Sequence, residues 1–270
     1  MAAALITFLS DYGLEDDFVG VCHGVIARIC PEARVIDLGH GIGRHDVRAG
    51  AILLQGALPY TPAGVHLAIV DPDVGAERRA VALRLADGRL LVGPDNGLLS
   101  LAAHDSGGVT EAVDLIRSRF RLQPVSATFH GRDIFAPVAA HLAAGVELPE
   151  MGDPCDPRDL VRLQLPEARF EAGGLVAHAI RVDRFGNVQL DAVHEQLAQT
   201  GLRLGRGIEV QSAAGASHRA AYGRTFADVA PGELLVYEDS SRRLALAISH
   251  GDAAARLGID IDDELRLSPA

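Results

Sequence analysis

The first half of the chain alternates short apolar runs with segments whose apolar residues recur at helical spacing. Apolar runs at residues 4–9 and 35–36 each precede a helical pattern, at 16–29 and 46–59, with Asp46 in the N-cap position of the second helix. Further strands are expected at 65–70, 80–85 and 90–92, and a further helix at 132–144. Strands that alternate with helices pack as an open, mostly parallel α/β sheet.

The second half follows a different pattern. Residues 153–171 hold three prolines with little periodicity, which is typical of a linker. Strands are then expected at 175–182, 207–211, 234–238, 244–248 and 264–267, with short helices at 194–200 and 253–257. Short strands separated by turn signals are typical of a small β-barrel or sandwich. We therefore expect an α/β domain over residues 1–165 and a small β domain over residues 166–270.

Composition excludes several classes of protein. All 25 basic residues are Arg, so a Schiff-base lysine and a P-loop lysine are ruled out. A net charge of −11 disfavours nucleic acids and anionic membranes as partners. Three cysteines without a CxxC pair give neither a disulfide framework nor a zinc signature. With no signal peptide or spanning segment recognised, we expect a cytoplasmic protein with no membrane partner.

Two strand ends carry carboxylates. Asp11 follows the first strand, where a carboxylate could accept hydrogen bonds from both hydroxyls of a ribose. The alternative is a helix N-terminus whose dipole is complemented by Asp16 and Asp17. Asp71 follows the third strand, and Arg78 lies seven residues later across a Pro/Gly turn. These two can fold back on each other, although a solvated surface ion pair is the alternative.

Two further segments carry functional groups. His130 precedes a helix, whose dipole disfavours the protonated imidazole, and a neutral imidazole can accept a proton from water. A capping or structural histidine is the alternative. Asp183, Phe185 and Asn187 combine a carboxylate, an aromatic face and an amide that could bind an adenine, unless they only form a hairpin turn. The histidines include no HxH or HxxxH pair, so no metal site is expected.

Together these segments resemble the S-adenosyl-L-methionine (SAM) hydrolases, also called SAM hydroxide adenosyltransferases, which are related to the SAM-dependent fluorinase and chlorinase. The resemblance runs nearly end to end and rests on FLSDYGLEDDFVG, DLGHGIGRHDVRAGAILL, VDPDVGAERR, GPDNGLL, FHGRD, DRFGN, TFADVAPGELLVY and GDAAARLGI. It implies an α/β domain followed by a β-barrel. It also implies a homotrimer whose sites lie between one subunit's N-terminal domain and its neighbour's C-terminal domain.

The resemblance implies hydrolysis of SAM to adenosine and L-methionine, with SAM as the substrate and no cofactor or metal. It assigns Asp71, Arg78 and His130 to the set around the attacking water, and Asp11 to the ribose. The remaining implied substrate-binding positions are Phe129, Asp183, Phe185, Asn187, Phe226 and Ser240. One departure is His45, which stands where the family usually has Trp or Phe.

Four positions favour the hydrolases over the halogenases. The resemblance implies that halogenases have Tyr at the Asp71 position and Thr at the Val74 position. It also implies that they have Tyr-Ser in place of His130-Gly131. A negative Asp71 would repel a halide and suits water or hydroxide. A SAM-dependent halogenase and a non-catalytic protein that binds adenosine or SAM remain the alternatives.

Overall fold

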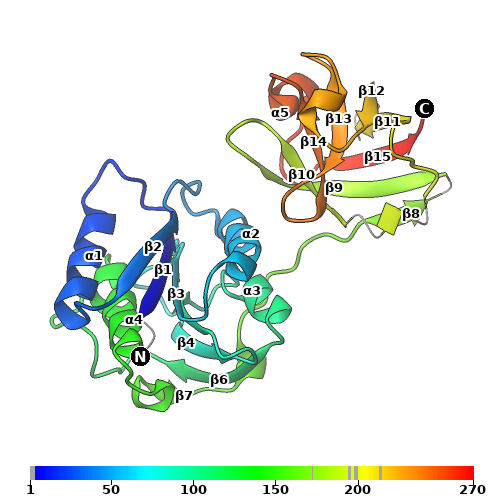
Figure 1. Ribbon diagram of the computed structural model, residues 1–270. Helices are drawn as coiled ribbons and strands as arrows, with labels where there is room; N and C mark the ends of the chain where they lie inside the picture. Colours follow the sequence, from blue (N-terminus) through cyan, green and yellow to red (C-terminus); the bar gives the residue numbers. More distant parts are fainter. Residues whose placement is uncertain (1–3, 172, 194–195, 198–199, 213–214) are drawn as a thin grey trace. The chain divides into compact units, whose positions relative to one another are not determined.

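A computed structural model describes residues 4–171, 173–193, 196–197, 200–212 and 215–270 (Figure 1). The chain divides into two compact units, Met1–Leu163 and Gln164–Ala270, close to the expected boundary at residue 165. Each unit is built around its own hydrophobic core. Within the described residues, no helix combines the length and apolar character needed to cross a bilayer.

The first unit contains a seven-stranded sheet in the order β2-β1-β3-β5-β4-β6-β7. The strands are β1 (Leu5–Ser10), β2 (Arg34–Gly39), β3 (Val65–Ile69), β4 (Ala80–Leu85), β5 (Leu90–Pro94), β6 (Val109–Asp114) and β7 (Asp153–Pro154). The first four strands in this order run parallel, whereas β4, β6 and β7 pair antiparallel. The predicted α/β sheet and the hairpin formed by β4 and β5 are therefore confirmed.

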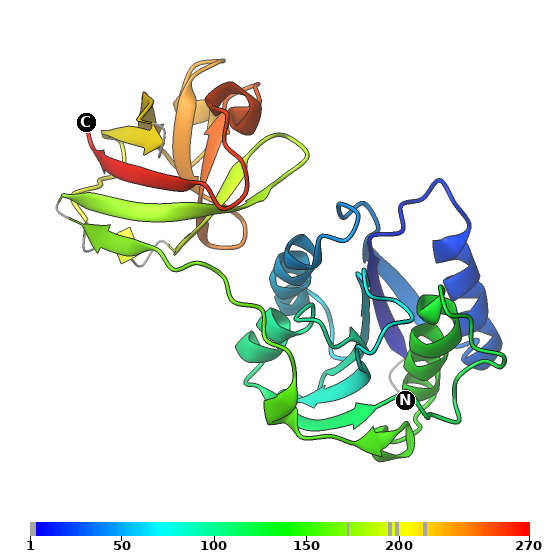
Figure 2. The same cartoon turned by 180° about the vertical axis from the view of Figure 1, so that it is seen from behind.

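Helices cover both faces of this sheet. One face packs against α1 (Phe18–Ile29) and α4 (Ala136–Ala143), and the other against α2 (Val47–Ala57) and α3 (Ser100–Asp105), as Figures 1 and 2 show. A π-helical turn, η2 (Gly131–Phe135), leads into α4. The predicted N-cap of α2 is confirmed, because Asp46 accepts a hydrogen bond of 2.8 Å from the Ala49 amide. The parallel strands and their helices set the carboxyl ends of β1, β2 and β3 at one edge.

The second unit is a closed barrel, as predicted. Its strands are β8 (Arg169–Glu171), β9 (Gly174–Val182), β10 (Val188–Val193), β11 (Gly207–Ser212), β12 (Ser217–Tyr222), β13 (Leu234–Glu238), β14 (Arg243–Ile248) and β15 (Glu264–Pro269). The order is β10-β14-β13-β12-β11-β15-β9-β8, and pairing of β10 with β9 closes it. The predicted helix at 253–257 is α5 (Ala253–Leu257). The helix expected at 194–200 falls largely outside the described residues.

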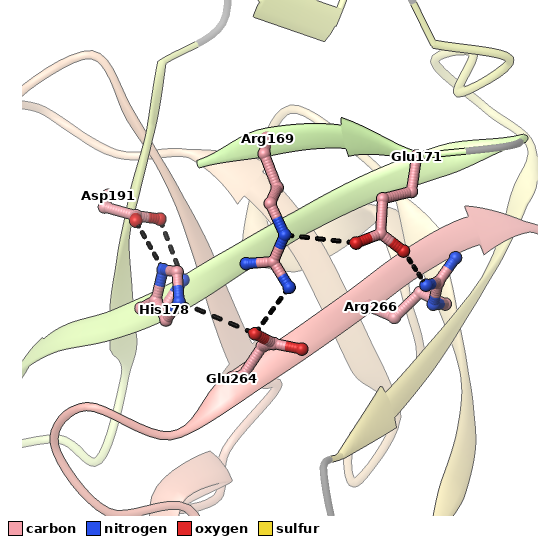
Figure 3. Close-up of polar contacts among 6 residues, drawn as sticks. All are labelled: Arg169, Glu171, His178, Asp191, Glu264 and Arg266. Atoms are coloured by element: carbon pink, nitrogen blue, oxygen red, sulfur yellow. Dashed lines mark hydrogen bonds and ion pairs between the residues drawn. The ribbon is translucent and has the colours of Figure 1, made fainter. Parts of the chain in front are cut away.

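An ionic network covers the outside of the barrel on β8, β9 and β15 (Figure 3). Arg169 bridges Glu171 at 3.1 Å and Glu264 at 2.7 Å, and Glu171 also pairs with Arg266. Most of these side chains are more than a third exposed, so each pair adds little stability. The network lies opposite the apolar residues of the same strands, which fill the barrel.

Candidate active site

A cavity of about 780 Å³ opens at the carboxyl ends of β1, β2 and β3. Its lining includes Asp11, Tyr12, His40, Asp71 and His130. This is the edge where open α/β sheets bind ligands, and the volume suits a small molecule. A second cavity of about 500 Å³, along β4, β5 and α3, is mainly apolar and lined by none of the predicted catalytic residues.

Asp71 lines this cavity and forms a buried ion pair with Arg78, which is not itself among the lining residues. The guanidinium Nε donates to Asp71 Oδ1 at 2.8 Å, and Nη2 donates to Oδ2 of the same carboxylate. The two side chains are only 6% and 7% exposed, so the alternative of a solvated surface pair is wrong. A fork-like, two-bond pair fixes the orientation of both groups. The ring of Phe135 lies 5.1 Å from the Arg78 guanidinium carbon and supports it further.

Gly75 allows the loop between Asp71 and Arg78 to approach the segment before His130. Its φ of +83° is in the region that favours glycine, and an added Cβ would overlap the carbonyl oxygen of Ala127. The two backbones can therefore come together only at a residue without a side chain. This contact brings Arg78 within reach of His130.

His130 receives the third hydrogen bond of the network. Its Nδ1 lies 2.9 Å from Arg78 Nη2, and because arginine can only donate, Nδ1 is the acceptor. The neutral ring therefore carries its proton on Nε2. Burial, and next the charge of Arg78, lower the pKa of His130 below its usual 6.5. Among the described residues its side chain makes no capping hydrogen bond, so the capping alternative is wrong.

One donor of Arg78 is left over. Its Nη1 is buried and has no hydrogen-bond partner within the part of the chain that the structure describes. Unsatisfied buried donors are costly and uncommon in native proteins. This donor belongs to the guanidinium that also contacts the Asp71 carboxylate and the His130 imidazole.

Tyr12 also lines the cavity, although the sequence did not single it out. Its ring packs against Phe18 and Phe129, with centroids 5.6 and 5.8 Å away. Burial raises the pKa of Tyr12 well above its usual value, so the phenol stays protonated. The hydroxyl occupies the space that a Cβ on Gly131 would need. Tyr12 thus packs directly against the segment that carries His130, a contact that no sequence motif indicates.

Two substrate-binding residues were predicted in the first unit, Asp11 and Phe129, and only Asp11 lines the cavity. Asp11 lines the cavity, and its Oδ2 accepts a hydrogen bond of 3.0 Å from the backbone amide of His45. His45 also lines the cavity and has a φ of +65°, which is uncommon for a residue with a side chain. Phe129 is not among the lining residues of this cavity and packs behind Tyr12.

Three of the predicted residues in the second unit form the turn between β9 and β10. Asp183 Oδ1 accepts from the backbone amides of Phe185 at 2.8 Å and Asn187 at 3.0 Å, and its Oδ2 accepts from the Asn187 side chain at 2.8 Å. The hairpin turn that was the alternative therefore exists, and it engages the Asn187 amide. The turn leaves the Phe185 ring 69% exposed.

Phe226 and Ser240 lie on other loops of the barrel. Phe226 is 46% exposed and its ring lies 5.1 Å from that of Tyr237. Burial raises the pKa of Tyr237 to about 12, and the neighbouring carboxylate of Asp183 adds to this shift. The barrel thus brings Phe226 and Asp183 to the same tyrosine. Ser240 is exposed in the turn between β13 and β14.

Comparisons with known proteins agree with this architecture. Sequence models described as the SAM hydroxide adenosyltransferase N-terminal and C-terminal domains match residues 6–152 and 177–266. A Salinispora tropica protein named (R)-S-adenosyl-L-methionine hydrolase is 51% identical over 97% of both chains. A fluorinase from an Actinoplanes species is 29% identical over 73% of this chain and 74% of its own.

A solved structure of similar sequence has the same fold. The crystal structure of an uncharacterized conserved protein from Thermotoga maritima has a TM-score of 0.91 at 34% identity, covering 97% of this chain and 99% of its own. Sequence models for both domains and full-length relatives therefore agree with the resemblance in the motifs. The chain belongs to the SAM hydroxide adenosyltransferase family.

Proposed function

We propose that this protein hydrolyses S-adenosyl-L-methionine to adenosine and L-methionine. The observation that carries the proposal is the buried network of Asp71, Arg78 and His130 at the edge of the cavity. The relatives named (R)-S-adenosyl-L-methionine hydrolase, up to 51% identical, support the same reaction. SAM is the small-molecule substrate, and the reaction described below uses no cofactor.

The reaction is a displacement at C5′ of SAM. A water oxygen forms the new C5′–O bond while the C5′–S bond breaks, and the bonding electron pair moves to sulfur. The sulfonium leaves as the neutral thioether of methionine, so the leaving group needs no general acid. Catalysis then rests on holding the water in line behind C5′, and positioning of this kind can lower a barrier by about 7–11 kcal/mol in favourable cases.

The network divides the work on the water. The His130 tautomer set by Arg78 presents an Nε2–H, which donates to the water oxygen and orients its other lone pair toward C5′. Asp71 accepts the proton that the water loses, because its carboxylate is the anionic acceptor in the network. Arg78 holds that carboxylate, and the positive charge of its guanidinium stabilises the developing hydroxide. The proton then passes to bulk solvent.

The proposal includes a homotrimer in which the barrel of one subunit completes the site of the next. Asp11 would bind the ribose, and Asp183, Phe185, Asn187, Phe226 and Ser240 would contact the adenine or methionine portion. The rings of Phe185 and Phe226 are 69% and 46% exposed, which leaves aromatic surface for contact with an adenine. The three free cysteines fit a reducing cytoplasm.

Electrostatics favours water over a halide as the nucleophile. The carboxylate of Asp71 lines the cavity, and an anion approaching it would be repelled unless Arg78 compensates. Arg78 is already paired with that carboxylate through two hydrogen bonds. Because this ion pair carries no net charge, it attracts an incoming halide weakly, whereas proton transfer from water to Asp71 leaves the Arg78 charge free to stabilise the hydroxide.

The test is chromatographic detection of adenosine from SAM with four variants. We expect Asp71→Asn, Arg78→Ala and His130→Ala each to lose at least about 100-fold in kcat. Asp73→Asn, an exposed carboxylate of the same loop, should retain wild-type activity. Formation of 5′-halo-adenosine with added halide would overturn the proposal in favour of a halogenase. Tight adenosine binding without SAM consumption would overturn it in favour of a binding protein.

A further inference from the structure

Three side chains converge on one carboxylate oxygen beside the active-site cavity. They are His23 on α1, Asp37 on β2 and His40 just after β2. Nε2 of His23 lies 2.9 Å from Asp37 Oδ1, and Nε2 of His40 lies 3.1 Å from the same oxygen. One donor atom from each residue lies within 4.8 Å of the others. The mechanism above uses none of the three.

An irregularity in β2 places these residues together. Phe8 pairs with Asp37 but the next residue, Leu9, pairs with Gly39, so β2 carries an extra residue at this point. In a regular strand, residues three apart point to opposite faces. The bulge and the end of the strand allow Asp37 and His40 to meet on the α1 side, where Phe8 contacts the His40 ring at 4.7 Å.

His40 is held as a metal ligand would be. Its side chain is 3% exposed, and its Nδ1 lies 2.7 Å from the Ser10 hydroxyl. Nε2 is buried and makes no hydrogen bond within the described residues. If Nδ1–H donates to Ser10, Nε2 directs a lone pair at the Asp37 carboxylate, an arrangement that a cation stabilises. Metal-bound histidines characteristically use the other ring nitrogen in such a contact.

We propose that His23, Asp37 and His40 bind one divalent transition-metal ion, with Zn²⁺ as the best fit. Ligands about 2.0–2.2 Å from a tetrahedral zinc lie roughly 3.3 Å apart, close to both nitrogen–oxygen distances here. Two imidazoles favour zinc and its neighbours over Mg²⁺ or Ca²⁺. The His23 and Asp37 side chains are 36% and 42% exposed, so a water molecule has access as the fourth ligand.

The site would stabilise one wall of the cavity rather than act on substrate. His40 lines the cavity, and its carbonyl accepts a hydrogen bond of 2.7 Å from the amide of Gly13 in the Asp11 loop. A metal that joins α1 to β2 would therefore fix the segment that carries Asp11, the carboxylate proposed to bind the ribose. A metal ion that binds the folded protein but not the unfolded chain also raises the unfolding temperature.

The experiment uses the untagged full-length protein after chelator treatment, titrated with Co²⁺ and followed by visible absorption. We expect one equivalent of Co²⁺ to give the intense bands of a tetrahedral site, and Zn²⁺ to abolish them. His23→Ala and Asp37→Ala should each weaken binding by at least about tenfold. His104→Ala, which removes an exposed histidine on α3, should bind as the wild type does.

Thermal unfolding with and without Zn²⁺ is a second measurement, which shows whether a variant that loses metal binding is still folded. We expect Zn²⁺ to raise the Tm of the wild type and of His104→Ala but not that of His23→Ala. The proposal is overturned if Co²⁺ gives no tetrahedral bands, or if His23→Ala and Asp37→Ala bind one equivalent as tightly as the wild type. Either result would mean that Asp37 simply accepts hydrogen bonds from the two imidazoles, or that metal binds only adventitiously elsewhere.

Discussion

Arg78 donates a hydrogen bond of 2.9 Å to Nδ1 of His130 and thereby fixes which nitrogen of the imidazole carries the proton. An imidazole protonated on both nitrogens could not accept this bond, so the bond and the lowered pKa of His130 favour the same state. In the proposed reaction the histidine is therefore the neutral donor toward the water, and Asp71 is the proton acceptor.

The first prediction concerns the pH dependence of hydrolysis. Because the pKa of His130 lies below 6.5, the ring is neutral above that pH and becomes protonated only as the pH falls further. We expect kcat/KM to be flat from neutral pH down to pH 6.5 and to fall below it, approaching about tenfold per pH unit. His130→Gln, which keeps an N–H donor but cannot titrate, should lose this descending limb. A limb that begins above pH 6.5 would contradict the assignment.

The second prediction concerns the packing of Tyr12 against Gly131. A side chain at position 131 would overlap the Tyr12 hydroxyl, and displacement of His130 by about 1 Å can cost about 100-fold in rate. We expect Gly131→Ala to lose activity on this scale and Tyr12→Phe to restore part of it in the double variant. Gly24→Ala, where nothing lies within 4 Å, is the control. Strictly additive effects in the double variant would argue against this contact.

The third prediction separates close approach from backbone strain. Gly75 and Gly88 have nearly the same φ, +83° and +86°, but only Gly75 faces another backbone segment within 4 Å. Both Ala variants should lose about 1 kcal/mol of stability from the strained φ. Gly75→Ala should in addition separate Arg78 from His130 and lose at least about tenfold in kcat. Steady-state kinetics and urea unfolding of both variants test this, and equal kcat values would contradict it.

The fourth prediction concerns His66, which is fully buried on β3 and lies 2.9 Å from the Thr7 hydroxyl. Burial, and next the charge of Arg89, lower the pKa of His66 from 6.5 to about 4. The folded state therefore favours the neutral ring. The free energy of unfolding falls as the pH drops from 6.5 toward 4, by about 3 kcal/mol at most.

Urea unfolding at several pH values tests the His66 prediction. We expect His66→Asn to be less stable than the wild type at neutral pH but to lose less further stability on acidification. His104→Asn, which alters an exposed histidine, should follow the wild type at every pH. If the wild type and His66→Asn had the same pH dependence, protonation of His66 would contribute nothing to acid destabilisation.

Much of the fold could be predicted from periodicity alone. The buried parallel strands β1 and β3 are mostly apolar, and the predicted bounds of β13, β14 and α5 agree with the structure to within one residue. Strands such as β6 and β12 were missed because they mix polar and apolar residues without clear alternation. Their position is set by pairing with distant strands, which a local pattern does not reveal.

The candidate site could be predicted only as far as its sequence motifs reached. Asp71, Arg78 and His130 were predicted from turns and the family resemblance, and the structure brings them into one network. Tyr12 was missed because its role depends on a contact with Gly131, which is distant in sequence. The His23, Asp37 and His40 cluster was missed for the same reason, since its spacing matches no metal motif and its geometry depends on a bulge.

The most direct test of the proposed reaction is a turnover of SAM in water enriched in oxygen-18. We expect one labelled oxygen at the 5′ position of adenosine and none in L-methionine, as attack of water on C5′ requires. The Asp71→Asn variant should give the same labelled product far more slowly. Adenosine without the label, label in methionine, or a 5′-halo nucleoside in its place would contradict hydrolysis by a water held at Asp71 and His130.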